Sequence, residues 1–181
     1  MKNKRNVVFL LIISFGLTGC AVSSFFSAEN LSPSISQRVA SCLNIQSKSA
    51  GAERNTEWCN LLALAMQNFD DEKYTDSENN FLQSTKNFKP SNGAAPGENL
   101  KLSYYGLAAS YDQEGRFKEA DASYEKIRKL FGEDLRYYNN LGYSLYLRGK
   151  TDAAITTIKK ALVLEPNNPV TLENYKLVTG G

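Results

Sequence analysis

The sequence predicts an all-α protein built from antiparallel helix hairpins that stack side by side as a short solenoid. Apolar residues recur at steps of three and four through most of the chain after residue 34, which is the spacing of amphipathic helices. The pattern of aromatic, apolar and small residues in 135–168 also occurs 34 positions earlier, in 101–134. Gly115 and Gly149 fall at equivalent sites, where one helix of each hairpin is expected to turn into the next.

The two segments resemble the tetratricopeptide repeat, a helix hairpin of about 34 residues. The residues that carry the resemblance are the apolar and small ones that pack the two helices of a hairpin together. They are Tyr104, Leu107, Ala108, Tyr111, Ala120, Tyr124 and Ile127 in the first segment, and Tyr138, Leu141, Gly142, Leu145, Ala154, Ile158 and Ala161 in the second, which Pro166 closes. The resemblance implies a short solenoid that binds other proteins.

A third and more degenerate copy of the repeat is predicted at 58–91, and we call it copy one. Copy two is 101–134 and copy three is 135–168. Asn68 and Ser84 of copy one stand at slots that should be apolar or small in the repeat. Segment 92–100 contains two glycines and a proline, which predicts a loop insertion between copies one and two. We expect this insertion to loosen the packing of copy one on copy two.

Single helices are predicted at both ends of the stack. The segment 34–55 carries an N-terminal cap helix over 34–46, followed by a polar loop. The segment 169–181 carries a C-terminal capping helix over 170–178. Such caps are needed because each repeat of a solenoid buries its core only against its neighbours.

The composition points away from several classes of function. The formal charge of the 181 residues is +2, but Lys2, Lys4 and Arg5 lie before the first apolar run. Without them, 18 basic residues face 19 acidic ones, so no nucleic-acid partner is expected. The chain has no histidine, and we find no catalytic or metal-binding motif. We therefore expect a protein that is not an enzyme, with no cofactor, no metal and no small-molecule substrate. The acidic run 70–72 is interpreted as a solvated turn, with a weak calcium site as the alternative.

Residues 1–19 have the basic start and short apolar run of a secretory signal peptide. The sequence LTGC that ends at Cys20 resembles the bacterial lipobox, which implies that Cys20 becomes the lipidated first residue. Because Ala21 follows it, the resemblance implies a lipid anchor in the outer membrane, with the protein facing the periplasm. Residues 20–33 are predicted to be the anchor and its tether. The sequence leaves open whether Phe25 and Phe26 pack on the domain or touch the membrane interface.

Cys42 and Cys59 are the two remaining cysteines. In an oxidising compartment such an even pair favours a disulfide, here between the N-terminal cap helix and the first helix of copy one. Two free, buried thiols are the alternative.

A partner-binding groove is expected on the concave face, which the first helix of each hairpin lines. By register its residues are Leu62, Met66 and Phe69 in copy one, Leu102, Tyr105, Ala109 and Asp112 in copy two, and Arg136, Asn139, Tyr143 and Tyr146 in copy three. Aromatic area with a few polar groups suits a peptide or a helix of a partner protein. Leu62, Tyr105 and Asn139 replace the lysines with which some members of the family hold a C-terminal carboxylate. The alternative is that part of this face packs on the N-terminal helix.

The function expected from these features is a membrane-anchored adaptor in envelope assembly that holds a protein partner. The NNLGYSL segment of copy three and the single helix after it are similar to the repeat lipoproteins of tight-adherence (Flp/Tad) pili and secretion systems. The alternative is a regulator or cofactor of cell-wall enzymes that act on peptidoglycan.

Overall fold

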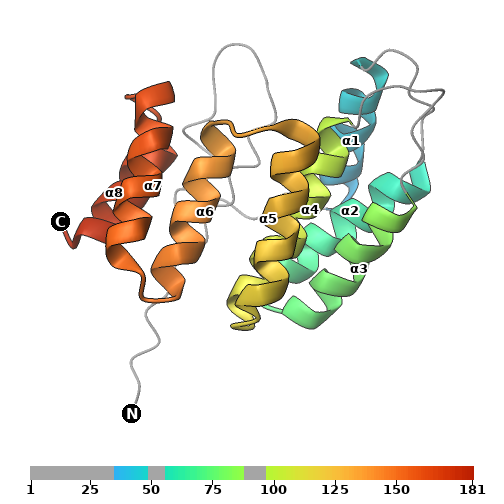
Figure 1. Cartoon of the computed structure of the whole chain (residues 1–181). Helices are drawn as coiled ribbons and strands as arrows, with labels where there is room; N and C mark the ends of the chain where they lie inside the picture. The colour runs from blue at the N-terminus through green and yellow to red at the C-terminus, as the bar shows by residue number, and fades with distance from the viewer. Residues whose placement is uncertain (1–34, 49–55, 88–96) are drawn as a thin grey trace.

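The computed structural model describes residues 35–48, 56–87 and 97–181, and this part of the chain is all-helical (Figure 1). The predicted signal peptide, Cys20, the tether with Phe25 and Phe26, and most of segment 92–100 lie outside the described residues. The helices are α1 (Ile35–Lys48), α2 (Thr56–Asp70), α3 (Tyr74–Lys86), α4 (Glu98–Gln113), α5 (Phe117–Phe131), α6 (Leu135–Leu147), α7 (Thr151–Leu164) and α8 (Pro169–Thr179). Among them, none is long and apolar enough to cross a bilayer.

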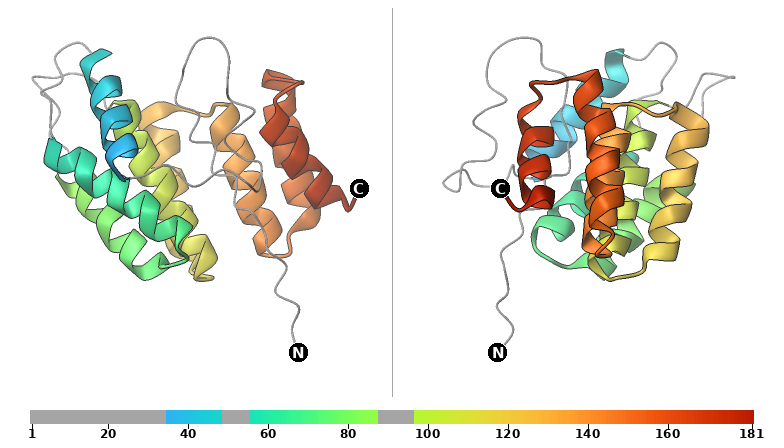
Figure 2. Two further views of the ribbon diagram at one scale, coloured as in Figure 1. Left: turned by 180° about the vertical axis from the view of Figure 1, so that it is seen from behind. Right: turned by 60° about the vertical axis from the view of Figure 1, so that its left-hand side comes forward.

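The helices pack in adjacent pairs, which confirms the predicted helical solenoid. Copies one, two and three are the hairpins α2–α3, α4–α5 and α6–α7. At the two ends, α1 packs on α2, and α8 packs on α7 and α6, as expected of capping helices. Figures 1 and 2 show α1 to α5 gathered at one end of the molecule and α6 to α8 at the other.

The turns inside the hairpins use the left-handed backbone conformation. Gly115 and Gly149 have φ of 72° and 73°, as their equivalent positions predict. The corresponding position of copy one is Glu72, with φ of 59°. A side chain is disfavoured in this region, so the turn of copy one is the more strained of the three. The degeneracy of copy one therefore extends to its backbone.

Two helix starts are fixed by side-chain caps. The Asp134 carboxylate accepts a hydrogen bond from the Tyr137 backbone nitrogen at 2.8 Å and starts α6. The Asn168 side chain accepts one from the Thr171 nitrogen at 3.1 Å, and Pro169 follows as the first residue of α8. By contrast, α4 begins at Glu98, inside the segment 92–100 that the sequence predicts to be a loop. The first helix of copy two is therefore longer than the repeat pattern indicates.

A disulfide joins α1 to α2. Cys42 and Cys59 are both buried, and their Cα atoms lie 5.6 Å apart. Around them, Trp58, Leu62 and Phe81 belong to the same hydrophobic core cluster. The bridge thus attaches the N-terminal cap helix to the copy whose sequence departs most from the repeat.

The packing of copy one on copy two is close, which contradicts the expectation that the insertion loosens it. The ring of Phe81 on α3 fills the space left by Gly106 on α4, where an added Cβ would lie 2.1 Å from the ring. On either side, hydroxyl pairs bridge the two helices. Ser77 and Ser110 lie 3.1 Å apart, and Ser84 and Ser103 lie 2.8 Å apart. The contact is decided by side-chain size along α3 and α4 rather than by the length of the connecting loop.

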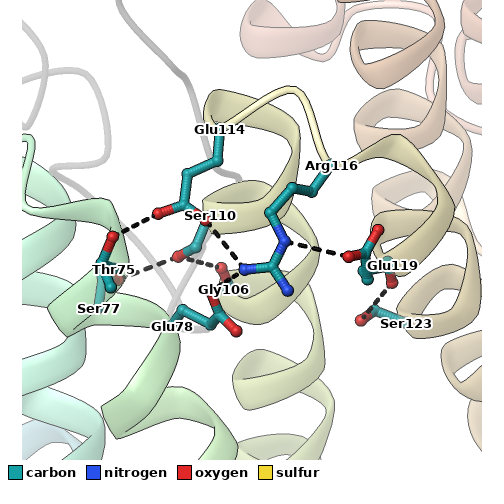
Figure 3. Close-up of polar contacts among 9 residues, drawn as sticks. All are labelled: Thr75, Ser77, Glu78, Gly106, Ser110, Glu114, Arg116, Glu119 and Ser123. Carbon is teal, nitrogen blue, oxygen red and sulfur yellow. Dashed lines mark hydrogen bonds and ion pairs between the residues drawn. The ribbon is translucent and has the colours of Figure 1, made fainter.

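Ion pairs reinforce this contact at the turn between α4 and α5 (Figure 3). The Arg116 guanidinium donates to Glu78 of α3, to Glu114 and to Glu119. Glu114 in turn accepts a hydrogen bond from Thr75 at 2.7 Å. Arg116 and Glu114 belong to copy two, and Glu78 and Thr75 belong to copy one. The network therefore links copy one to copy two at this turn.

Candidate functional site

Most of the predicted groove residues are buried in the structure. Of the eight predicted in copies two and three, six are buried, namely Leu102, Tyr105, Ala109, Asp112, Asn139 and Tyr143. Arg136 and Tyr146 are partly exposed. Burial of these six side chains means that most of this face is not open for a partner in this conformation.

Asp112 is a contact within the protein rather than a partner-facing group. Its carboxylate accepts hydrogen bonds from the Ser144 hydroxyl at 2.7 Å and the Tyr124 hydroxyl at 3.3 Å. Arg148 lies 3.4 Å from the same carboxylate. Burial raises the pKa of Asp112 to about 6, against the lowering effect of the hydrogen bonds from Ser144, Arg148 and Tyr124. Asp112 therefore joins copy two to copy three, and the prediction that it faces a partner is corrected.

Asn139 likewise bonds inside the solenoid. Its side-chain oxygen accepts a hydrogen bond from the Asn174 amide of α8 at 3.1 Å. Its side-chain nitrogen lies 3.4 Å from the Asn140 side-chain oxygen. A buried amide is retained at little cost only when it is paired in this way. The polar group expected to fix the register of a bound peptide instead fixes α8 on copy three.

Tyr105 of α4 and Arg136 of α6 lie near each other and make contacts within the solenoid. The Tyr105 hydroxyl donates to the Asp134 carboxylate at 3.4 Å, which links it to the cap of α6. The Arg136 guanidinium contacts Glu98 at the start of α4 and lies 6.0 Å from the centroid of the Tyr105 ring. The two Arg136 contacts thus join α6 of copy three to α4, whereas the Tyr105 bond to Asp134 stays within copy two.

Tyr146 keeps partial exposure in copy three, as Phe69 does in copy one. Its ring centroid lies 6.3 Å from that of Tyr143, with the two rings tilted relative to each other. Tyr146 also packs against the buried residues Ala154, Ile158 and Val178 of the C-terminal core. It thus presents an anchored aromatic edge on α6, the kind of group that supplies contact area at little entropic cost.

The acidic run at the turn of copy one is paired with cations and amides. Arg38 of α1 contacts Asp70, and Lys73 lies 3.4 Å from Asp71. The Gln67 amide also donates to Asp71 at 2.9 Å. Within the described residues no group of three or more His, Cys, Asp or Glu side chains is placed to hold a metal ion.

The junctions between copies are the feature that sequence reasoning misses. The register of the repeat shows which residues fill the inside of one hairpin, but it does not show how tightly one hairpin meets the next. The signal that could find the close junction is the row of small residues on α4, which are Ser103, Gly106 and Ser110. Small side chains at this spacing allow two helices to approach closely.

Comparison with known families gives two matches, both to the tetratricopeptide repeat. Residues 102–130 match one model of the repeat, and residues 135–168 match a second model. No curated protein matches the chain. The matched residues cover α4–α5 and α6–α7, the two hairpins at which the sequence pattern is most regular. Together with the helical solenoid, these two matches support a tetratricopeptide-repeat protein.

Proposed function

We propose that this chain is a lipid-anchored scaffold that holds a protein partner in a bacterial envelope machine. The observation that carries the proposal is the stacking of two matched tetratricopeptide repeats, because this family generally serves protein–protein interaction. The partner would contact α6 around Tyr146, a partly exposed residue of the predicted groove. An extended peptide or an amphipathic helix is the chemistry that suits a partly exposed tyrosine edge on a helix.

The envelope machine that we favour is an Flp/Tad-type pilus or secretion system. The support is the similarity of the NNLGYSL segment and of the single helix after copy three to repeat lipoproteins of such systems. The second candidate is a regulator of cell-wall enzymes. Neighbouring genes for a secretin and a pilus ATPase favour the first function, whereas genes for peptidoglycan enzymes favour the second.

The anchor is tested by the variant Cys20→Ala in the full chain. We expect this protein to move from the membrane fraction to the soluble fraction, because the variant lacks the thiol that carries the lipid. The measurement is the share of the protein in each fraction after cell lysis. A variant that stays in the membrane fraction to the extent of the unaltered protein would show that Cys20 is not the anchor.

The partner surface is tested by photo-crosslinking in cells that carry the native envelope. The variant Tyr146→p-benzoylphenylalanine keeps an aromatic ring on α6 and is expected to crosslink to one envelope protein, identified by mass spectrometry. The matched control is Val163→p-benzoylphenylalanine on α7, where the native side chain is 79% exposed. Crosslinking of the same protein with equal yield from both positions would contradict binding on α6.

A further inference from the structure

The hydrophobic core of the solenoid is divided at the junction between copies two and three. One cluster of buried residues extends through α1 to α5 and includes Tyr137 of α6, and Tyr138 and Leu141 of α6 pack against it. A second cluster is formed by Ala154, Ile158 and Val178, with Leu145 and Tyr146 packed against it, and belongs to α6, α7 and α8. The helices that meet between the clusters are α5 and α6. Figures 1 and 2 show the helices grouped in a similar way, with α1 to α5 at one end and α6 to α8 at the other.

Side-chain size explains the division. On α4, the residues that face copy one are Ser103, Gly106 and Ser110, which admit the Phe81 ring. The equivalent positions on α6 hold Tyr137, Asn140 and Ser144. Larger side chains at two of the three positions keep α5 and α6 from approaching as α3 and α4 do. The ring of Tyr124 on α5 meets that of Tyr137 edge-on at 6.3 Å.

Polar and charged groups fill this junction. The Asp112 side chain is fully buried and bonds to Tyr124, Ser144 and Arg148. The Arg148 side chain is 8% exposed, and its guanidinium also contacts Asp121 of α5 at 2.6 Å. The Asn140 side-chain nitrogen and the Arg148 Nε atom are buried here without a hydrogen-bond partner in the structure. Buried charges and unpaired donors cost free energy, so closure of this junction is weakly favoured.

We propose that the junction between α5 and α6 is a hinge, and that proton uptake by Asp112 stabilises its closed form. Copies one and two would move as one body, and copy three with α8 as the other. The connection between the bodies is short and contains Gly132, whose φ is 79°. Opening would separate Asp112 on α4 from Ser144 and Arg148 at the end of α6, and would admit water to the carboxylate.

Linkage determines the sign of the pH dependence. Burial raises the pKa of Asp112 to about 6 in the closed form, and hydration in the open form returns it toward the ordinary value of 3.8. Between these values the closed form binds the proton more strongly, so acidification favours closure and a rise in pH favours opening. The ratio of open to closed molecules should therefore increase about tenfold from about pH 5 to about pH 7.5.

The other ionisable groups around Asp112 do not reverse this sign. On α5, burial raises the pKa of the Tyr124 hydroxyl well above its usual value, so the phenol stays neutral in this range. On α6, burial likewise raises the pKa of Tyr143, whose neighbours include Tyr74 of α3. The Arg148 guanidinium pairs with both Asp112 and Asp121. From the remaining elements that pack on α4, Arg38 of α1 pairs with Asp70 of α2, and Glu78 of α3 pairs with Arg116.

The hinge is tested by distance measurements on the detergent-solubilised full chain. Spin labels are attached through Lys126→p-acetylphenylalanine on α5 and Lys159→p-acetylphenylalanine on α7, both exposed positions that leave the cysteines untouched. Double electron–electron resonance measures the distance between the two labels. It should give one short distance at about pH 5 and an added population of longer distances at about pH 7.5. Identical distance distributions at the two pH values would overturn the proposal.

Two variants assign the proton. Asp112→Asn mimics the uncharged side chain and is expected to remain closed at both pH values, whereas Asp121→Asn, altered at an exposed partner of Arg148, should keep the response. A pH response in Asp112→Asn, or its loss in Asp121→Asn, would contradict the role of Asp112. If Asp112→Asn loses its helical circular dichroism, the variant Ser144→Ala is used in its place to test the role of Asp112. This variant removes a hydrogen bond to the carboxylate and should shift the opening midpoint to higher pH, and an unchanged midpoint would overturn the proposal.

Discussion

Replacing Phe81 by alanine is expected to lower the free energy of unfolding by about 3–5 kcal/mol, because it leaves a cavity where copy one meets copy two. The Phe81 side chain is 1% exposed and lies against the backbone of Gly106. Urea unfolding followed by circular dichroism measures the loss. A cost below about 1 kcal/mol would mean that α3 and α4 are not packed as the structure places them.

The variant Gly106→Ala tests the same contact from the opposite side. In an ordinary helix interior this change stabilises by about 1 kcal/mol, but here the added Cβ would lie 2.1 Å from the Phe81 ring. We therefore expect a net loss of about 1–3 kcal/mol from overpacking. In the Phe81→Ala background the obstruction is gone, and Gly106→Ala should become stabilising. The same sign in both backgrounds would contradict the contact.

Loss of the disulfide between Cys42 and Cys59 is expected to cost about 3 kcal/mol in the double variant Cys42→Ala with Cys59→Ala. The bridge closes a loop across a sequence separation of 17, and it restricts the unfolded chain accordingly. The measurement is again the free energy of unfolding in urea. The cost should appear mainly as easier release of α1 from α2, the two helices that the bridge joins.

The control for the disulfide is a reducing agent. Reduction should lower the stability of the unaltered protein by a similar amount and leave that of the double variant unchanged. Thiol titration of the denatured, unreduced protein should find neither Cys42 nor Cys59. Two reactive thiols at these positions would show that the alternative of free, buried cysteines is correct.

The order of the helices follows from the sequence because hairpin packing is encoded locally. Slots such as Ala120 and Ala154 must be small, and Ile127 and Ala161 must be apolar, for two helices joined by a short turn to pack. The turn glycine can be recognised in the same way, because few residues other than glycine adopt a positive φ without a cost in free energy. These requirements repeat every 34 residues in copies two and three, so the pattern can be recognised without the structure.

The relation between hairpins does not follow from the sequence in the same way. An inserted loop indicates a weak junction only if the loop holds the two hairpins together. Here the hairpins are held together by the fit of Phe81 on Gly106 instead. The uninterrupted step from copy two to copy three looks regular, yet Tyr137 and Asn140 separate the helices there. Register also placed Asp112 and Asn139 on an open face, whereas inter-helix hydrogen bonds draw both inward.

Capture of a protein partner by copy three is central to the proposed function, and photo-crosslinking from position 146 tests it most directly. The proposal predicts that Tyr146→p-benzoylphenylalanine crosslinks to a single envelope protein. The control Val163→p-benzoylphenylalanine should not crosslink to that protein. If the crosslinked protein is a pilus or secretion component, the result supports a role in an Flp/Tad-type system. If it is a peptidoglycan enzyme, the result supports a regulator of cell-wall enzymes. No crosslinked protein from position 146, in cells where the variant is folded and present at normal levels, would contradict a scaffold that binds through α6.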